Sequence, residues 1–312
     1  MIGSCGTFMM KYTQILTLAV SALLSLSLLA SCGDTDTSAD TGAAAGTTIA
    51  ETAAAETAAA ETAAAEIAAE TEPIAPISNL LFEDSFDGTA LDDSKWERCP
   101  EWNRQGTLCV WDDDMSYLDG EGHLVLRAEW DAENSRVQSG AVRTAGLFSA
   151  GYGYYEASIC FPTAPGTWGA FWMMCGDVSG EDGSAADGVE IDIIESIGND
   201  WGACNSALHW DGYGDSHQQV SSGELYNHGI YDGEFHTFGL ERTEGGYVFY
   251  IDGAERWRVT ADQCAPCPEE GYMKLTVEAA DWAGAGSDAC IAGLPAEMLV
   301  DYVKVYREKP GE

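Results

Sequence analysis

Residues 79–312 consist of short runs in which apolar and polar positions alternate, separated by turns rich in Gly, Asp and Asn. Runs of this kind are typical of β-strands, whereas a helix would repeat its apolar positions every three or four residues. No long stretch has a helical period, so the pattern predicts an all-β sandwich or barrel, and the length fits one large sandwich. Clear examples of such runs are Leu124–Ala128, Tyr155–Ile159, Tyr247–Ile251 and Leu299–Tyr306.

The beginning of the chain has a different pattern. An apolar stretch over 15–30 follows Lys11 and ends in Leu29-Ala30-Ser31-Cys32. It is too short and too rich in Ser and Thr for a membrane span and is typical of a secretory signal. The last four residues resemble a bacterial lipoprotein signal, which implies that Cys32 is lipidated and anchors the chain to the outside of the cell envelope. An ordinary signal peptide with a stray cysteine is the alternative.

Residues 33–78 form an acidic segment between this signal, 1–32, and the body, 79–312. Glu51, Glu56, Glu61 and Glu66 recur every five residues in Glu-Thr-Ala-Ala-Ala units, and large apolar residues are almost absent. Such a composition cannot build a core, so we expect a partly helical linker that holds the following domain away from the envelope.

The charge of the chain limits its partners. There are 52 Asp and Glu against 14 Lys and Arg, a formal net charge of −38. Nucleic-acid binding needs clustered basic residues, which are absent, and a polyanionic substrate is disfavoured for the same reason. The sequence therefore predicts a monomer that binds no nucleic acid and touches the membrane only through Cys32.

The body contains eight cysteines, an even number that suggests disulfides in an exported domain. Cys99 and Cys109 enclose a short loop and are the best candidate pair. Cys264 and Cys267 have the spacing of redox and zinc motifs, but no second Cys/His pair at zinc spacing accompanies them. For Cys264 and Cys267 we therefore favour either a structural disulfide or free thiols over a redox or zinc site.

The segment Gly188–Ser196 carries the candidate chemistry. Read as a strand, it places Glu190 and Asp192 on one face and Ile191 and Ile193 on the other. The next position on the acidic face is Ile194, but one extra residue, a β-bulge, returns Glu195 to that face. A structural strand gains nothing from three adjacent carboxylates, because like charges on one sheet face repel.

Catalysis can use such a row of carboxylates. Four strand steps separate the Cα atoms of Glu190 and Glu195 by about 13 Å. Side chains that lean inward bring the two carboxylates to about 5 Å, the separation of a retaining glycosidase. Asp192 between them can shift their pKa values apart. A solvated acidic strand or a cation site remains the alternative on spacing alone.

Glu-Ile-Asp-Ile-Ile-Glu is similar to the active-site signature of glycoside hydrolase family 16 in its bulged form. Other segments resemble the family in the same order along nearly all of the body. They are Phe82–Gly88, Ser94–Trp96, Gly122–Leu126, Tyr152–Ala157, Trp168–Met174, Phe235–Glu241, Tyr250–Gly253 and Val300–Tyr306.

The resemblance implies a jelly-roll sandwich of two curved antiparallel sheets, with a polysaccharide cleft on the concave face. It implies retaining hydrolysis through a covalent glycosyl-enzyme, without a cofactor. Glu190 is then the nucleophile, Glu195 the acid/base, and Asp192 the residue that orients the nucleophile.

Further residues are candidates for substrate contacts, because aromatic faces stack on sugar rings. Trp168 and Trp172 match cleft positions of the family, and His209 follows the acids by one strand; burial in the core is the alternative for each. Arg143 could equally pair with a surface acid. The weaker candidates are Trp210, Arg143, Glu278 and Trp282.

A structural calcium ion is a further implication of the resemblance. Asp301 begins the final strand motif, where family members often bind calcium, and the Gly122 carbonyl is a second candidate ligand. Calcium takes oxygen ligands that include backbone carbonyls, so a sequence reveals such a site poorly.

The bulged signature is shared by enzymes with several substrates. The few bases of the body favour a neutral β-1,3 or mixed β-1,3-1,4 glucan. Ala141 stands where many laminarinases have Arg, so a neutral or mucin-type galactan remains an alternative. A non-catalytic glycan-binding jelly roll is another, as is transglycosylation, but a binding module has no use for two glutamates across a bulge.

Overall fold

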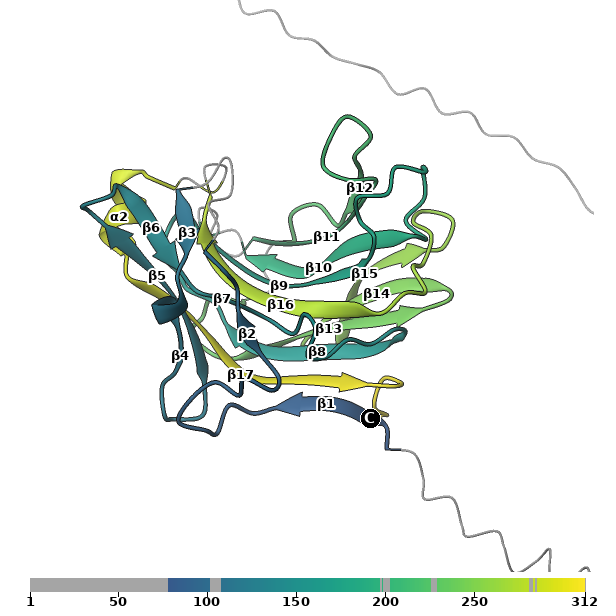
Figure 1. The fold of residues 1–312 in the computed structure, drawn as a ribbon, viewed down its shortest axis with the longest axis horizontal. Helices are drawn as coiled ribbons and strands as arrows, with labels where there is room; N and C mark the ends of the chain where they lie inside the picture. Colours follow the sequence, from purple (N-terminus) through teal and green to yellow (C-terminus); the bar gives the residue numbers. More distant parts are fainter. Residues whose placement is uncertain are drawn as a thin grey trace, which may run out of the picture. The chain divides into compact units, whose positions relative to one another are not determined.

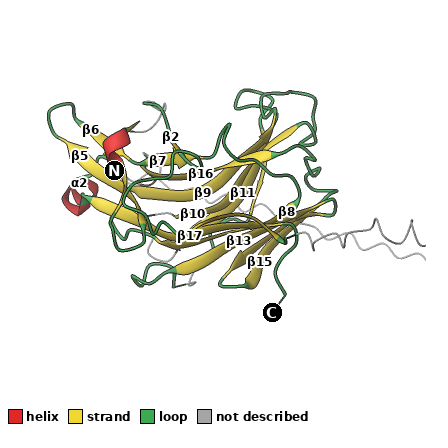
Figure 2. Cartoon of the chain, turned by 60° about the horizontal axis from the view of Figure 1, so that its bottom comes forward, coloured by secondary structure: helices red, strands yellow, loops and turns green. Residues whose placement is uncertain are grey.

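The computed structural model describes residues 78–101, 108–196, 198, 203–225, 229–280, 283 and 285–311. Within this part of the chain almost every regular element is a β-strand, as the alternating pattern predicts (Figure 2). The described helices are the 3₁₀ turn η1 (Asp113–Met115) and the six-residue α2 (Asp288–Gly293), which begins at the Ser287 cap, whose side chain accepts a hydrogen bond from the Cys290 N–H. No helix of the described residues is long and apolar enough to cross a membrane.

The strands form two curved sheets that lie one above the other (Figure 1). We call the ten-stranded one the outer sheet and the seven-stranded one the cleft sheet. The cleft sheet has the order β12 (Gln218–Ser221), β11 (Cys204–Trp210), β10 (Gly188–Ser196), β9 (Thr167–Gly176), β16 (Gly271–Ala279), β7 (Ala141–Arg143) and β2 (Glu97–Arg98).

The outer sheet follows the path β15 (Ala254–Thr260), β14 (Gly246–Ile251), β13 (His236–Thr243), β8 (Gly153–Cys160), β17 (Ala296–Tyr306), β5 (Leu124–Asp131), β6 (Arg136–Ser139) and β3 (Cys109–Trp111). Two further strands join it, β1 (Leu80–Asp84) on β17 and β4 (Ser116–Leu118) on β5. The described pairings are antiparallel apart from β3 with β6, which is parallel. This is the predicted jelly-roll sandwich.

One apolar core joins the inner faces of the two sheets. In β9 and β10, Phe171, Met173, Ile191 and Ile193 are directed into it, and each is almost completely buried. Because side chains alternate along a strand, the residues between them face the other side of the cleft sheet. This alternation positions the polar groups of the candidate site.

No disulfide joins any of the eight cysteines of the body. The predicted Cys99–Cys109 disulfide is therefore wrong. Cys109 belongs to the main core, whereas Cys99 packs in a separate small cluster with Trp111 and Ala141. Cys264 and Cys267 are also buried and unbridged, which agrees with the free-thiol interpretation.

Candidate active site

A β-bulge in β10 places three carboxylates on one face of the cleft sheet. The register of β10 with both neighbours shifts after Asp192, so that Asp192 pairs with Trp172 and Glu195 with Ala170. On the other side Glu195 pairs with Asn205 of β11. The predicted bulge is thus present. It directs Ile193 and Ile194 into the core and returns Glu195 to the face of Glu190 and Asp192.

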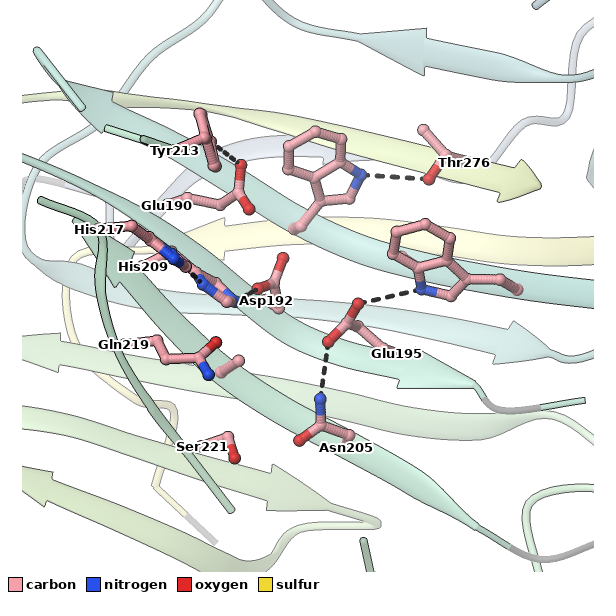
Figure 3. A pocket seen from close by; sticks show the side chains of 14 residues that line it. Glu190, Asp192, Glu195, Asn205, His209, Tyr213, His217, Gln219, Ser221 and Thr276 are labelled. Carbon is pink, nitrogen blue, oxygen red and sulfur yellow. Dashed lines mark hydrogen bonds and ion pairs between the residues drawn. The ribbon is translucent and has the colours of Figure 1, made fainter. Parts of the chain in front are cut away.

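An open pocket of about 450 Å³ lies over this face. Figure 3 shows Glu190, Asp192 and Glu195 in a row along β10, pointing into it. Trp168 and Trp172 of β9 and His209 of β11 also line it. Six of the residues that the sequence singled out therefore meet in one pocket.

Glu195 is held by a hydrogen bond to each of its oxygens. The indole N–H of Trp168 donates to Oε1 at 3.0 Å, and the Asn205 amide donates to Oε2 at 2.8 Å. Burial, reinforced by the charge of Asp192, raises the pKa of Glu195 to about 8, although His209 and the Trp168 hydrogen bond act in the opposite direction. At neutral pH this carboxyl carries a proton that it can give to a bound molecule.

Glu190 has a different partner. The hydroxyl of Tyr213, from the loop that follows β11, donates a hydrogen bond to Glu190 Oε2 (Figure 3). Both glutamates are buried, but their partners differ. Glu195 accepts from an indole and an amide, whereas Glu190 accepts from a tyrosine hydroxyl.

Asp192 lies between them and contacts His209. Nε2 of His209 is 3.3 Å from Asp192 Oδ2, and its Nδ1 is 3.0 Å from Nε2 of His217. The two imidazole rings stack at 5.1 Å. Atoms of Glu190, Asp192 and His209 that could ligate a metal ion lie within 4.8 Å of one another, so this trio is also able to hold a divalent cation.

The two indoles at the pocket wall are fixed by separate contacts. Trp168 is tied to Glu195, as above, and the Trp172 N–H donates to Thr276 Oγ1 at 3.2 Å. The ammonium of Lys274 lies over the Trp172 ring, 3.7 Å from its centroid, and 4.8 Å from that of Trp111. Burial of Lys274 lowers its pKa to about 8.

The three weaker substrate-contact candidates that the structure describes, Trp210, Arg143 and Glu278, do not line the pocket. Trp210 is buried in the core, because it follows His209 directly and must face the opposite side of β11. Arg143 pairs with Glu97 of β2 at 2.7 Å, the surface-acid alternative. Glu278 is buried in β16, where it is the cross-strand partner of Trp168 in β9. Trp282 lies outside the described residues.

Sequence reasoning missed Tyr213, His217, Asn205 and Lys274. Asn205 and Lys274 occupy cleft-face positions, which the alternation of β11 and β16 indicates once the sheet is known. Tyr213 and His217 belong to a loop rich in Gly and Asp, and only their aromatic character in such a run could have drawn attention to them.

The two candidate calcium ligands lie in neighbouring parts of the outer sheet. Val300 of β17 pairs with Leu124 of β5, which places Asp301 close to the residues just before Leu124, including Gly122. The register of β17 with β8 shifts between Val300 and Tyr302, so the backbone around Asp301 leaves the regular ladder. A carboxylate beside irregular backbone carbonyls fits calcium, and the site stays a prediction.

Comparisons with known proteins agree with this geometry. A family model described as "Beta-porphyranase A-D, GH16 domain" matches residues 79–308. The chain is 25% identical over 269 residues to glucan endo-1,3-beta-glucosidase A1 of Niallia circulans, covering 77% of this chain and 39% of that protein. It is 30% identical over 168 residues to endo-1,3-1,4-beta-glycanase EglC of Rhizobium meliloti, covering 54% and 33%. The chain thus spans about a third of the length of these curated relatives.

Solved structures share the fold. The laminarinase catalytic domain of Thermotoga maritima superposes with a TM-score of 0.62 at 24% identity, over 75% of this chain and 99% of that one. SCLam, a non-specific endo-beta-1,3(4)-glucanase from family GH16, superposes with a TM-score of 0.64 at 26% identity, over 76% and 97%.

Proposed function

Because the chain belongs to glycoside hydrolase family 16, we propose that it is a retaining endo-glycosidase that hydrolyses β-1,3 or mixed β-1,3-1,4 glucan. The observation that carries this proposal is the contrast between the two glutamates on one face of β10. Glu195 is protonated at neutral pH because burial raises its pKa to about 8, while Glu190 accepts a hydrogen bond in the same pocket. The names of the two curated relatives support the choice of glucan.

In this mechanism Glu195 gives its proton to the oxygen of the leaving sugar as Glu190 attacks the anomeric carbon. The bond to the leaving sugar breaks and an ester of Glu190 forms. Glu195, now ionised, takes a proton from water, and that water releases the sugar from Glu190. The charge of Asp192 raises the pKa of Glu195 and so keeps its proton available for the first step.

The pocket walls supply binding surface for a neutral glycan. The partly exposed indole of Trp168 presents apolar area to sugar rings. Trp172 also lines the pocket, but it is buried and the Lys274 ammonium covers one face of its ring. The hydrogen bonds of their N–H groups to Glu195 and Thr276 fix the orientation of both rings.

The test uses the full chain with laminarin and barley mixed-linkage glucan, beside Glu190→Ala and Glu195→Ala. Oligosaccharides from the wild type, with β-configured ends at early times, support the proposal. On an aryl β-glycoside, whose leaving group needs no proton, azide should rescue both variants with opposite product anomers, α for the missing nucleophile and β for the missing acid/base. Glu129→Ala, on the outer sheet, is the control that should retain activity. Products of inverted configuration from the wild type contradict the mechanism.

A second candidate is a galactan endo-hydrolase on the same machinery. It is favoured by the description of the matching family model and by a 26% identical relative named keratan-sulfate endo-1,4-beta-galactosidase. The net charge of −38 opposes a highly sulfated polymer. Products from agarose, porphyran or mucin O-glycans alone, with none from laminarin or barley glucan, would establish this function instead.

We also propose that the enzyme acts as a monomer anchored outside the cell through a lipid on Cys32, a residue outside the described part of the chain. The signal-like segment that ends at Cys32 supports this placement. Radioactive palmitate should label the wild type expressed in bacteria and not Cys32→Ser. Labelling of both, or release of the wild type into the medium, would contradict it.

A further inference from the structure

The loop between β11 and β12, residues 211–217, is built to hold a fixed shape at the Glu190 end of the pocket. Asp211 and Gly212 both have left-handed backbone, with φ of 59° and 69°, and turn the chain sharply out of β11. The buried Asp211 carboxylate accepts hydrogen bonds from the Gly183 N–H at 3.1 Å and from the Gln218 amide. The cost of left-handed backbone at an aspartate is thus offset by these contacts.

The same loop is tied along its length to the segment that connects β9 and β10. The Gly212 N–H donates to the Val178 carbonyl at 2.7 Å, and the Ser216 hydroxyl donates to Glu181 at 2.9 Å. Two connections of the cleft sheet are therefore joined by hydrogen bonds. Tyr213 directly follows Gly212, so it starts from a fixed point of the backbone.

The side chain of Tyr213 extends from this loop to the carboxylates of β10. The residue is 61% exposed, yet its hydroxyl donates to Glu190 Oε2 (Figure 3). Its ring lies 6.0 Å from that of His217, which stacks on His209 of β11. Tyr213 is exposed and its hydroxyl donates a hydrogen bond to a buried carboxylate. Packing in the core therefore does not explain its position.

We propose that Tyr213 is a positioning residue for the nucleophile, an inference that rests on the proposed function of Glu190. Its hydrogen bond occupies Oε2 and fixes the orientation of the carboxylate, so that Oε1 is presented to the anomeric carbon. In the first step the Oε1–carbon bond forms, the bond from that carbon to the leaving oxygen breaks, and the leaving oxygen takes the proton of Glu195. Oε2 keeps its donor throughout.

Other titratable groups also face Glu190. They are Asp192 and Glu195 on its own strand, His209 on β11, His217 in the loop, and Lys274 and Tyr272 on β16. All of them remain in Tyr213→Phe, which removes one hydroxyl and keeps the ring. A change in this variant therefore reports the loss of the hydrogen bond.

The experiment compares the wild type with Tyr213→Phe on the best glycan substrate. We expect kcat to fall about tenfold with KM nearly unchanged, since a nucleophile that has lost its fixed orientation slows bond formation more than substrate binding. Tyr250→Phe is the matched control, because its hydroxyl donates to Glu241 at 2.9 Å in the outer sheet. It should change neither quantity.

A second readout does not require activity. The ¹³C signal of the Glu190 carboxyl, assigned with Glu190→Gln, should move at a fixed pH in Tyr213→Phe and stay in place in Tyr250→Phe, because only the first variant removes a hydrogen-bond donor to this carboxyl. An unchanged kcat and an unchanged signal overturn the inference even if the enzyme is active. If the wild type cleaves no glycan, the proposed function fails, and the carboxyl signal alone then decides whether Tyr213 acts on Glu190.

Discussion

The two indoles of the pocket offer a test of what determines the pKa of Glu195, because Trp168 donates a hydrogen bond to this carboxyl and Trp172 donates to Thr276. Trp168→Phe removes the N–H that donates to Glu195 Oε1 at 3.0 Å and keeps an aromatic ring. Trp172→Phe removes an N–H that donates to Thr276 instead. Both variants keep an aromatic ring and lose one indole N–H, so a difference in the pKa of Glu195 between them reports the contact with the carboxylate.

The sign and size of the effect follow from that contact. A hydrogen bond to the ionised form lowers a carboxyl pKa, so losing it raises the pKa of Glu195 further above its value of about 8. A hydrogen bond to a charged group stabilises it by about 1.5–3 kcal/mol, and the same donor also stabilises the neutral acid to a smaller extent. Since one pKa unit corresponds to about 1.4 kcal/mol, we expect a rise of about one unit.

The assay is the pH dependence of kcat/KM between about pH 5 and pH 10 on the best glycan substrate. The basic limb, which reports loss of the acid's proton, should move to higher pH by about one unit in Trp168→Phe and stay in place in Trp172→Phe. Equal shifts in both variants, or a downward shift in Trp168→Phe, would refute this account of how Glu195 is tuned.

Two further predictions concern stability. Glu195 titrates at about 8 in the folded chain but near about 4.3 when unfolded, so the folded state binds more protons between these values and its stability falls as pH rises through them. In urea unfolding, Glu195→Gln should therefore be more stable than the wild type by a few kcal/mol at about pH 8 and equally stable at about pH 4; the same difference at both would contradict this. Arg242 is fully buried and donates to the carbonyls of Ala150, Gly151, Cys267 and Glu269. The first two also accept from the Tyr155 hydroxyl, so Arg242→Met should cost about 3 kcal/mol or more by removing the arginine donor of the Cys267 and Glu269 carbonyls. Arg258→Met, which breaks an exposed pair with Glu255, should cost less than about 1 kcal/mol, and equal losses in the two variants would show that the buried carbonyls find other donors.

Much of the cleft face could be read from the sequence, because a strand has only two faces. The interruption of the alternation at Ile194 indicated the bulge, and with it the side of the sheet that Glu195 would take. The same logic excludes Trp210, since a neighbour of His209 in a strand cannot share its face. Once the face of one residue is known, the alternation of side chains gives the face of every other residue in the strand.

Contacts between segments distant in sequence could not be read in this way. Tyr213 reaches Glu190 only because the loop turns at Asp211 and is braced by the segment before β10. Arg143 is drawn to Glu97 because β2 happens to be the strand beside β7. The Cys99–Cys109 prediction was wrong for a related reason: closeness along the chain does not decide which apolar cluster each thiol enters.

The bulge in β10 has a consequence for how this chain can change length. A residue removed from a regular strand inverts every side chain beyond the deletion. Here two residues, Ile193 and Ile194, both turn into the core where a regular strand would place one. Loss of Ile194 would therefore straighten the strand and leave both Glu195 and Ser196 on their present sides. We therefore expect a deletion of Ile194 to keep the three carboxylates on one face, whereas a deletion at a regular position of β10 would invert part of the row.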